Sequence, residues 1–135
     1  MTKYFNILTR SIKLYLTLLI ISTGVIIYGT LFPVDYKISS SLAGLDKVVH
    51  FIMFGAWAFF YGIIRFLKDK FTLYPVFLVG GAFGLTIEFL QYLLPTGRSP
   101  EFMDFIADIS GTGMAILFLF ILTKKVPEFN PDTAS

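Results

Sequence analysis

The chain has 135 residues, of which 56% are hydrophobic and 15% are charged, and its formal net charge is +2. Soluble domains carry about 25% charged residues, so this composition excludes intrinsic disorder and a soluble surface of ordinary polarity. The lack of cysteine excludes disulfides and thiol nucleophiles, and the small net charge gives no sign of a nucleic-acid partner. The composition therefore predicts one small integral membrane domain over residues 1–135.

Four apolar stretches are each long enough to cross a bilayer core of about 30 Å, which takes about 20 helical residues. We predict an all-α bundle of four transmembrane helices, over about residues 12–32, 48–67, 73–94 and 102–123. Pro33 ends the first helix and Pro95 follows the third. Ser99, Pro100 and Glu101 have the pattern of an N-cap followed by a first turn, so the fourth helix is expected to start early.

The distribution of Lys and Arg predicts the orientation of the bundle. Eight lie in the two terminal flanks and the middle loop: Lys3, Arg10, Lys13, Arg65, Lys68, Lys70, Lys124 and Lys125. Three lie on the other side: Lys37, Lys47 and Arg98. Because positive charge accumulates in cytoplasmic flanks, both termini should face the cytoplasm, and the loops after the first and third helices should lie outside.

Polar side chains inside the apolar segments gather near the outer ends of the last three predicted helices. In chain order they are Asp46, Lys47 and His50, then Glu88 and Gln91, then Arg98 in the adjoining loop, then Asp104 and Asp108. Ionisable groups in membrane segments are costly and usually functional, so this convergence predicts a binding or catalytic site in the outer half of the membrane.

Small residues continue two of these polar faces along the helices. Gly80 and Gly84 lie on the face of Glu88, and Gly111 lies on the face of Asp108. Small residues let helix backbones approach closely in lipid. We therefore expect the third and fourth helices to pack along these faces and to turn the two carboxylates towards each other.

Several of these residues also have purely structural interpretations. Asp46 suits a helix cap, Lys47 an interfacial anchor that extends outward, and Gln91 a hydrogen bond between helices. Arg98 suits either a carboxylate partner that fixes its loop or bidentate capture of a phosphate.

The composition of the polar layer also raises the question of a metal site. His50, Glu88 and Asp108 would make a set of one histidine and two carboxylates, but no paired-ligand motif such as H-E-x-x-H supports it. We therefore expect no metal and no cofactor.

The order and spacing of the polar motifs resemble those of the VanZ-like family over roughly residues 33 to 122. The motifs are Asp46-Lys47-x-x-His50-Phe51-x-x-Phe54, Glu88-x-x-Gln91, Pro95-x-Gly97-Arg98 and Asp104-x-x-x-Asp108-x-x-Gly111. The resemblance implies a small multi-pass protein of the bacterial cytoplasmic membrane, in a family whose founding member is linked to teicoplanin resistance. It implies binding roles for the eight polar residues named above, and it supplies no reaction.

Two functions of different classes follow from the polar layer and the resemblance. In the first, a non-enzymatic envelope protein binds a lipid, a lipid-linked cell-wall precursor or a lipoglycopeptide, and contributes to glycopeptide resistance or envelope homeostasis. In the second, a membrane-embedded enzyme acts on a phospholipid or polyprenyl-linked substrate, with Glu88 and His50 as an acid–base pair. Proton-coupled transport is disfavoured because the ionisable groups occupy one half of the membrane, and four helices would need to form an oligomer to enclose a path.

Overall fold

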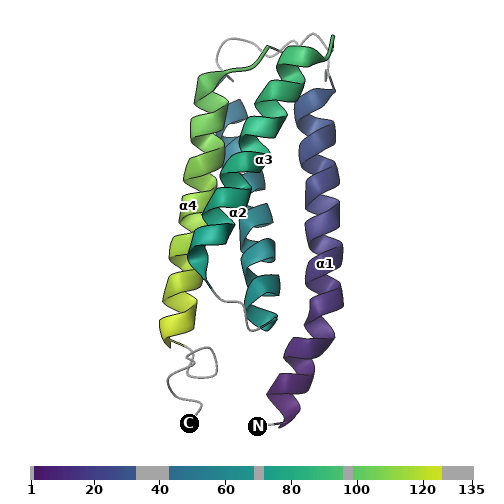
Figure 1. Cartoon of the computed structure of the whole chain (residues 1–135), viewed down its shortest axis with the longest axis vertical. Helices are drawn as coiled ribbons and strands as arrows, with labels where there is room; N and C mark the ends of the chain where they lie inside the picture. The colour runs from purple at the N-terminus through teal and green to yellow at the C-terminus, as the bar shows by residue number, and fades with distance from the viewer. Residues whose placement is uncertain (1, 33–42, 69–71, 96–98, 126–135) are drawn as a thin grey trace.

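A computed structural model describes residues 2–32, 43–68, 72–95 and 99–125 of the chain. Its helices are α1 (Thr2–Leu31), α2 (Ala43–Leu67), α3 (Leu73–Leu93) and α4 (Phe102–Lys125), as Figure 1 shows. Each contains a stretch long and apolar enough to cross a membrane. The prediction of an all-α bundle with four membrane-spanning helices is confirmed.

The helix starts differ from the predicted ones where polar residues adjoin the apolar stretches. α1 begins well before Ile12, where its apolar stretch starts, because polar residues near the helix start do not break it. α2 begins at Ala43 instead of about residue 48, so Asp46 lies inside the first turn and does not cap the helix. α4 begins at Phe102, in agreement with its predicted range of about 102–123 and not as early as Ser99, and at this start the carbonyl of Glu101 accepts the backbone N–H of Asp104 at 2.9 Å.

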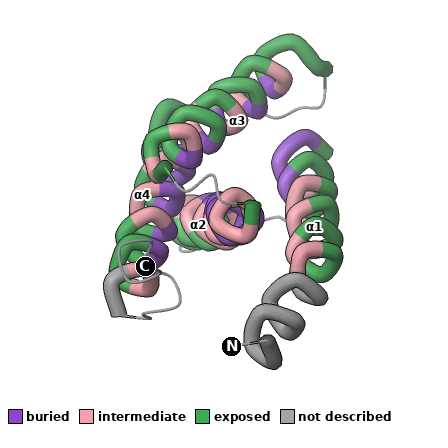
Figure 2. The backbone as a smooth tube through the Cα atoms, turned by 60° about the horizontal axis from the view of Figure 1, so that its bottom comes forward, coloured by how far each residue is buried: buried purple, intermediate pink, exposed green. Residues whose placement is uncertain are grey.

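α2 occupies the centre of the bundle, with α1, α3 and α4 around it (Figure 2). The core between them includes Ile26, Phe54, Trp57 and Ile87, which are all buried. α1 contacts α2 and α3, and within the described ranges it makes no contact with α4. Within the described residues, α1 is therefore attached to the bundle through α2 and α3 alone.

The outer surface of the bundle is apolar. Tyr28, Ile52, Leu85 and Phe118 are among many large hydrophobic side chains that are exposed. Soluble proteins rarely expose contiguous apolar surface of this kind, whereas lipid chains solvate it well. The exposed faces of the helices are thus suited to a membrane interior.

Two glycines bring α2 and α4 into close contact. A Cβ on Gly111 would meet the carbonyl oxygen of Phe51, and it would lie 3.0 Å from the backbone nitrogen of Gly55. A Cβ on Gly55 would in turn lie 3.2 Å from the carbonyl oxygen of Gly111. The prediction that Gly111 packs against the third helix is therefore wrong, because this residue faces α2.

The contact between α3 and α4 uses the predicted glycines on the α3 side. A Cβ on Gly80 would lie 2.7 Å from Cγ2 of Thr112, and one on Gly84 would lie 3.1 Å from Oδ2 of Asp108. Larger residues at these positions would push α3 away from α4. The two glycines thus allow α3 to cover the buried face of Asp108.

Candidate functional site

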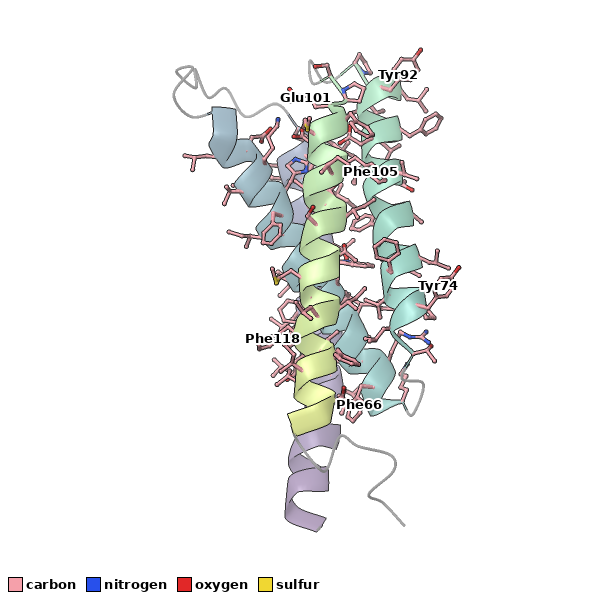
Figure 3. All side chains as sticks on the ribbon, turned by 90° about the vertical axis from the view of Figure 1, so that its left-hand side faces the viewer. Phe66, Tyr74, Tyr92, Glu101, Phe105 and Phe118 are labelled. Atoms are coloured by element: carbon pink, nitrogen blue, oxygen red, sulfur yellow. The ribbon has the colours of Figure 1, made fainter. Side chains whose placement is uncertain are left out.

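The predicted site residues gather at the end of the bundle where α2 and α4 begin and α3 ends, which we call the polar end. Figure 3 shows Glu101 and Tyr92 at this end, and Tyr74 and Phe66 at the opposite end. Arg98 lies outside the described residues. The other seven predicted residues are Asp46, Lys47, His50, Glu88, Gln91, Asp104 and Asp108.

Lys47 joins the first turns of α2 and α4 by ion pairs. Its Nζ lies 2.5 Å from Oε2 of Glu101 and 2.8 Å from Oδ1 of Asp104. Acidic residues are favoured near helix N-termini, and those of α4 stand opposite this ammonium. Nζ also lies 3.8 Å from Oδ2 of Asp46, so the partly exposed side chain of Lys47 turns towards three carboxylates at this end of the bundle.

His50 and Asp108 form a buried pair between α2 and α4. Nδ1 of His50 lies 2.9 Å from Oδ1 of Asp108, and the two side chains are 2% and 0% exposed. An ionised carboxylate only accepts hydrogen bonds, so Nδ1 carries the donated proton. This contact turns Nε2 of the same ring towards Oδ2 of Asp104, which lies 4.0 Å away.

Gln91 links α3 to the end of α1. Its Nε2 donates a hydrogen bond to the carbonyl oxygen of Thr30 at 2.9 Å, as the interhelical interpretation expects. The last four carbonyls of a helix have no partner within the helix, and Thr30 is in the last turn of α1. Gln91 therefore satisfies one of these carbonyls and fixes α1 against α3.

Glu88 faces the start of α4. Its carboxylate lies near the backbone of Glu101, and its Oε1 is buried without a hydrogen-bond partner among the described residues. In that part of the chain no hydrogen bond joins Glu88 to His50, whose carboxylate partner is Asp108. The carboxylate that contacts His50 directly is thus that of Asp108, and the enzymatic hypothesis for Glu88 and His50 stays a prediction.

Three residues of the polar end were not recognised as site residues in the sequence: Glu101, Thr30 and Thr112. Glu101 precedes Asp104 by three positions, and this spacing was a usable sign that both acids face the same neighbour. Thr112 is buried against Gly80, one turn after Asp108. The contribution of Thr30 is a backbone carbonyl, which no side-chain pattern indicates.

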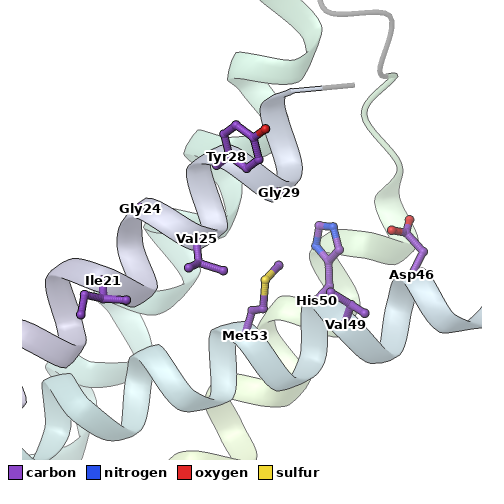
Figure 4. Close-up of a pocket in the computed structure, with 9 residues that line it drawn as sticks. All are labelled: Ile21, Gly24, Val25, Tyr28, Gly29, Asp46, Val49, His50 and Met53. Carbon is purple, nitrogen blue, oxygen red and sulfur yellow. The ribbon is translucent and has the colours of Figure 1, made fainter. Parts of the chain in front are cut away.

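A groove of about 430 Å³ lies between α1 and α2 and reaches the polar end (Figure 4). Its lining residues are Ile21, Gly24, Val25, Tyr28 and Gly29 from α1, and Asp46, Val49, His50 and Met53 from α2. Most of its wall is apolar, and the ionisable groups in its lining are at one end. The arrangement can hold an elongated molecule with an apolar body and a polar head.

Comparison with known proteins identifies one family. The sequence model of the VanZ/LLP1 family matches residues 4–123, which is nearly the whole chain. No curated protein and no solved structure matches the chain.

Proposed function

The chain belongs to the VanZ/LLP1 family of membrane proteins, and from this premise we propose that it binds a membrane amphiphile in the groove between α1 and α2. The amphiphile is a lipid, a lipid-linked cell-wall precursor or a lipoglycopeptide. Its apolar part lies along α1 and α2, and its polar part meets Asp46 and His50.

The shape and lining of the groove are the observation that supports this proposal. Its volume of about 430 Å³ falls within the range of about 300–1,000 Å³ that is usual for small-molecule sites. Such sites are mostly apolar, with a few polar groups that fix the orientation of the ligand. Here the polar groups lie at one end only, and that asymmetry matches a lipid-like molecule better than a uniformly polar one.

In the cell, the proposed binding takes place at the outer face of the bacterial cytoplasmic membrane. The excess of Lys and Arg in the termini and middle loop supports this orientation. A protein that holds cell-wall lipids, or the lipid tail of a glycopeptide, at this face would change the action of teicoplanin-type antibiotics. The family resemblance supports this role in resistance or envelope homeostasis.

The binding proposal is tested by filling the groove. A Cβ on Gly24 would have no heavy atom within 4 Å, so Gly24→Leu places a side chain in the groove without a backbone clash. Gly81→Leu is the matched control, because Gly81 is equally open but does not line the groove. Native mass spectrometry should show at least a tenfold loss of bound phospholipid in Gly24→Leu only; equal binding by both variants contradicts the proposal.

The cellular role is tested by deletion of the gene and complementation. We expect the deletion strain to become more sensitive to teicoplanin, and complementation with Gly81→Leu but not Gly24→Leu to restore the original sensitivity. Unchanged sensitivity in both the deletion and an overexpressing strain would refute the resistance role while leaving amphiphile binding to the mass spectrometry result.

A further inference from the structure

We propose that Asp46, His50 and Asp104 bind one divalent first-row transition-metal ion at the polar end. Each residue offers one ligand atom, and these atoms all lie within 4.8 Å of one another. Asp46 and His50 are one turn apart on α2, and Asp104 comes from the first turn of α4. The site therefore exists only when these two helices are packed together.

The orientation of His50 is the first observation that favours a metal. Histidines that ligate a metal almost always donate their second ring N–H to a carboxylate or carbonyl, which fixes the ring and its tautomer. His50 makes this contact through Nδ1 to Asp108. Its Nε2 points towards Oδ2 of Asp104 at 4.0 Å, and the side chain is only 2% exposed.

Asp104 is oriented in a corresponding way by a partner of its own. Its Oδ1 pairs with the ammonium of Lys47 at 2.8 Å, while its Oδ2 faces His50. Two ligand atoms that each lie about 2.1 Å from a tetrahedral ion are about 3.4 Å apart, so the measured separation of 4.0 Å would have to shorten by about 0.6 Å. The two ligand atoms therefore fit one ion with small side-chain movements.

The charge of the polar end also calls for a cation. The described side chains include five carboxylates: Asp46, Glu88, Glu101, Asp104 and Asp108. Opposite them, among the described residues, stand the ammonium of Lys47 and the imidazole of His50. Asp104 and Asp108 are buried, whereas Asp46 and Glu101 are partly exposed, and a divalent ion bound among these carboxylates would be the largest local charge.

The donor set determines the class of metal. Mg²⁺ and Ca²⁺ prefer oxygen ligands alone, whereas imidazole with carboxylates suits Zn²⁺, Mn²⁺ and similar ions. Three protein ligands leave an open coordination position, as in catalytic zinc sites. The sequence pattern combines His50 with Glu88 and Asp108 as a possible ligand set and predicts no metal. The structure instead places Asp46 and Asp104 beside the histidine and Asp108 behind it.

The proposed metal site shares two of its three ligands with the lining of the groove. Asp46 and His50 line the groove as well as the proposed site. An open coordination position on the ion is thus placed to accept a phosphate oxygen from the polar part of an amphiphile. Only this last step rests on the proposed function.

The test uses the full chain, purified in detergent without a histidine tag, since His50 is its only histidine. The protein is stripped with EDTA and titrated with ZnCl₂, and then with CoCl₂ to record the visible absorption of a bound Co²⁺. We expect one Zn²⁺ per chain and a Co²⁺ spectrum that changes when His50 is replaced. Failure of the stripped wild-type protein to take up either ion at micromolar concentration would overturn the proposal.

Variants identify the ligands. His50→Ala and Asp104→Asn should weaken Zn²⁺ binding at least 100-fold, and Asp108→Asn, which acts through His50, about 10- to 100-fold. Glu101→Gln is the matched control, because it removes a carboxylate from the start of α4 but none of the ligands, and it should keep Zn²⁺. Equal binding by His50→Ala would refute the site.

Two further measurements distinguish the loss of a metal ligand from unfolding of the protein and from loss of the bound amphiphile. Asp46 is partly exposed, so Asp46→Asn should weaken Zn²⁺ binding while the helical circular dichroism and the elution volume stay unchanged. Gly24→Leu should bind Zn²⁺ like the wild type, because it fills the groove and leaves all three ligands in place. Zn²⁺ binding that persists in Asp46→Asn, Asp104→Asn and His50→Ala alike would place the ion elsewhere.

Discussion

At the scale of single residues, the polar end depends on side chains that hold one another in position. Asp108 fixes the ring of His50, and Lys47 fixes the carboxylate of Asp104. Each pair joins α2 to α4. Removal of Lys47, or of either member of the His50–Asp108 pair, leaves a buried polar group on the other helix. An unsatisfied buried hydrogen-bonding group costs about 1–3 kcal/mol, more than the same hydrogen bond contributes when it forms.

The His50–Asp108 pair gives the first stability prediction. Asp108→Ala leaves Nδ1–H of His50 buried without an acceptor, and we expect a loss of about 1–3 kcal/mol in the free energy of unfolding. Asp108→Asn retains an oxygen acceptor at the same place and should unfold close to the wild type. Thermal unfolding in detergent, followed by circular dichroism, measures both; an Ala variant as stable as the Asn variant would contradict the assigned contact.

At the scale of helices, the α2–α4 pair is set by backbone contact. Gly55 and Gly111 face each other so closely that a Cβ on either would approach the backbone of the other helix. Backbone atoms cannot rotate away as a side chain can. The spacing of these two helices therefore also controls whether the residues of the polar end reach each other.

Substitution of these glycines provides the second prediction. Gly111→Ala should force α2 and α4 apart and destabilise the protein by about 1–3 kcal/mol, in the range of overpacked cores. Gly113→Ala is the matched control on the same helix, because its Cβ would have no heavy atom within 4 Å. Alanine is the better helix former, so the control should melt at the same or a higher temperature; equal melting of both variants would contradict the close packing.

Helix geometry explains which parts of the packing could be predicted from the sequence. An α-helix turns about 100° per residue, so Gly111 and Thr112 point about 100° apart around α4. The first faces α2 and the second faces α3. A stripe of small residues in the sequence shows that a face is narrow, but it does not show which of two neighbouring helices covers that face.

The candidate site likewise has one feature that the sequence could predict and one that it could not. The sequence gives the depth of each polar residue along its helix, because the rise per residue is fixed, and so it could predict that three helices place polar groups at one end. It could not predict partners. Lys47 pairs with Glu101 and Asp104, and His50 with Asp108, because of how the helices are rotated about their axes, and sequence spacing leaves that rotation open.

At the scale of the whole molecule, the central position of α2 determines how the other helices are attached. α4 packs closely against α2 through glycines, whereas the described side chains of α1, over residues 12–31, include three buried ones: Ile26, Thr30 and Leu31. The groove lies on this less extensive α1 contact. Occupation of the groove should therefore alter α1 without disturbing the α2–α4 pair.

Membrane orientation provides the third prediction. The chain has no cysteine, so Ser99→Cys and Thr72→Cys each introduce a single thiol at an exposed position and leave every charge unchanged. With eight Lys and Arg on one side and three on the other, we expect a membrane-impermeant maleimide to label Ser99→Cys in intact cells. Thr72→Cys should be labelled only after permeabilisation; the reverse pattern would place the polar end in the cytoplasm.

The pairing of α2 with α4 has a consequence for how the protein is made. His50 and Asp108 are 58 positions apart, so at a synthesis rate of about 5–20 residues per second His50 waits roughly 3–12 s for its partner. During that interval Asp46, Lys47 and His50 enter the membrane region before the acids of α4 exist. Because unpaired ionisable groups are costly inside a bilayer, we expect α2 to become stably embedded only after α4 has been made.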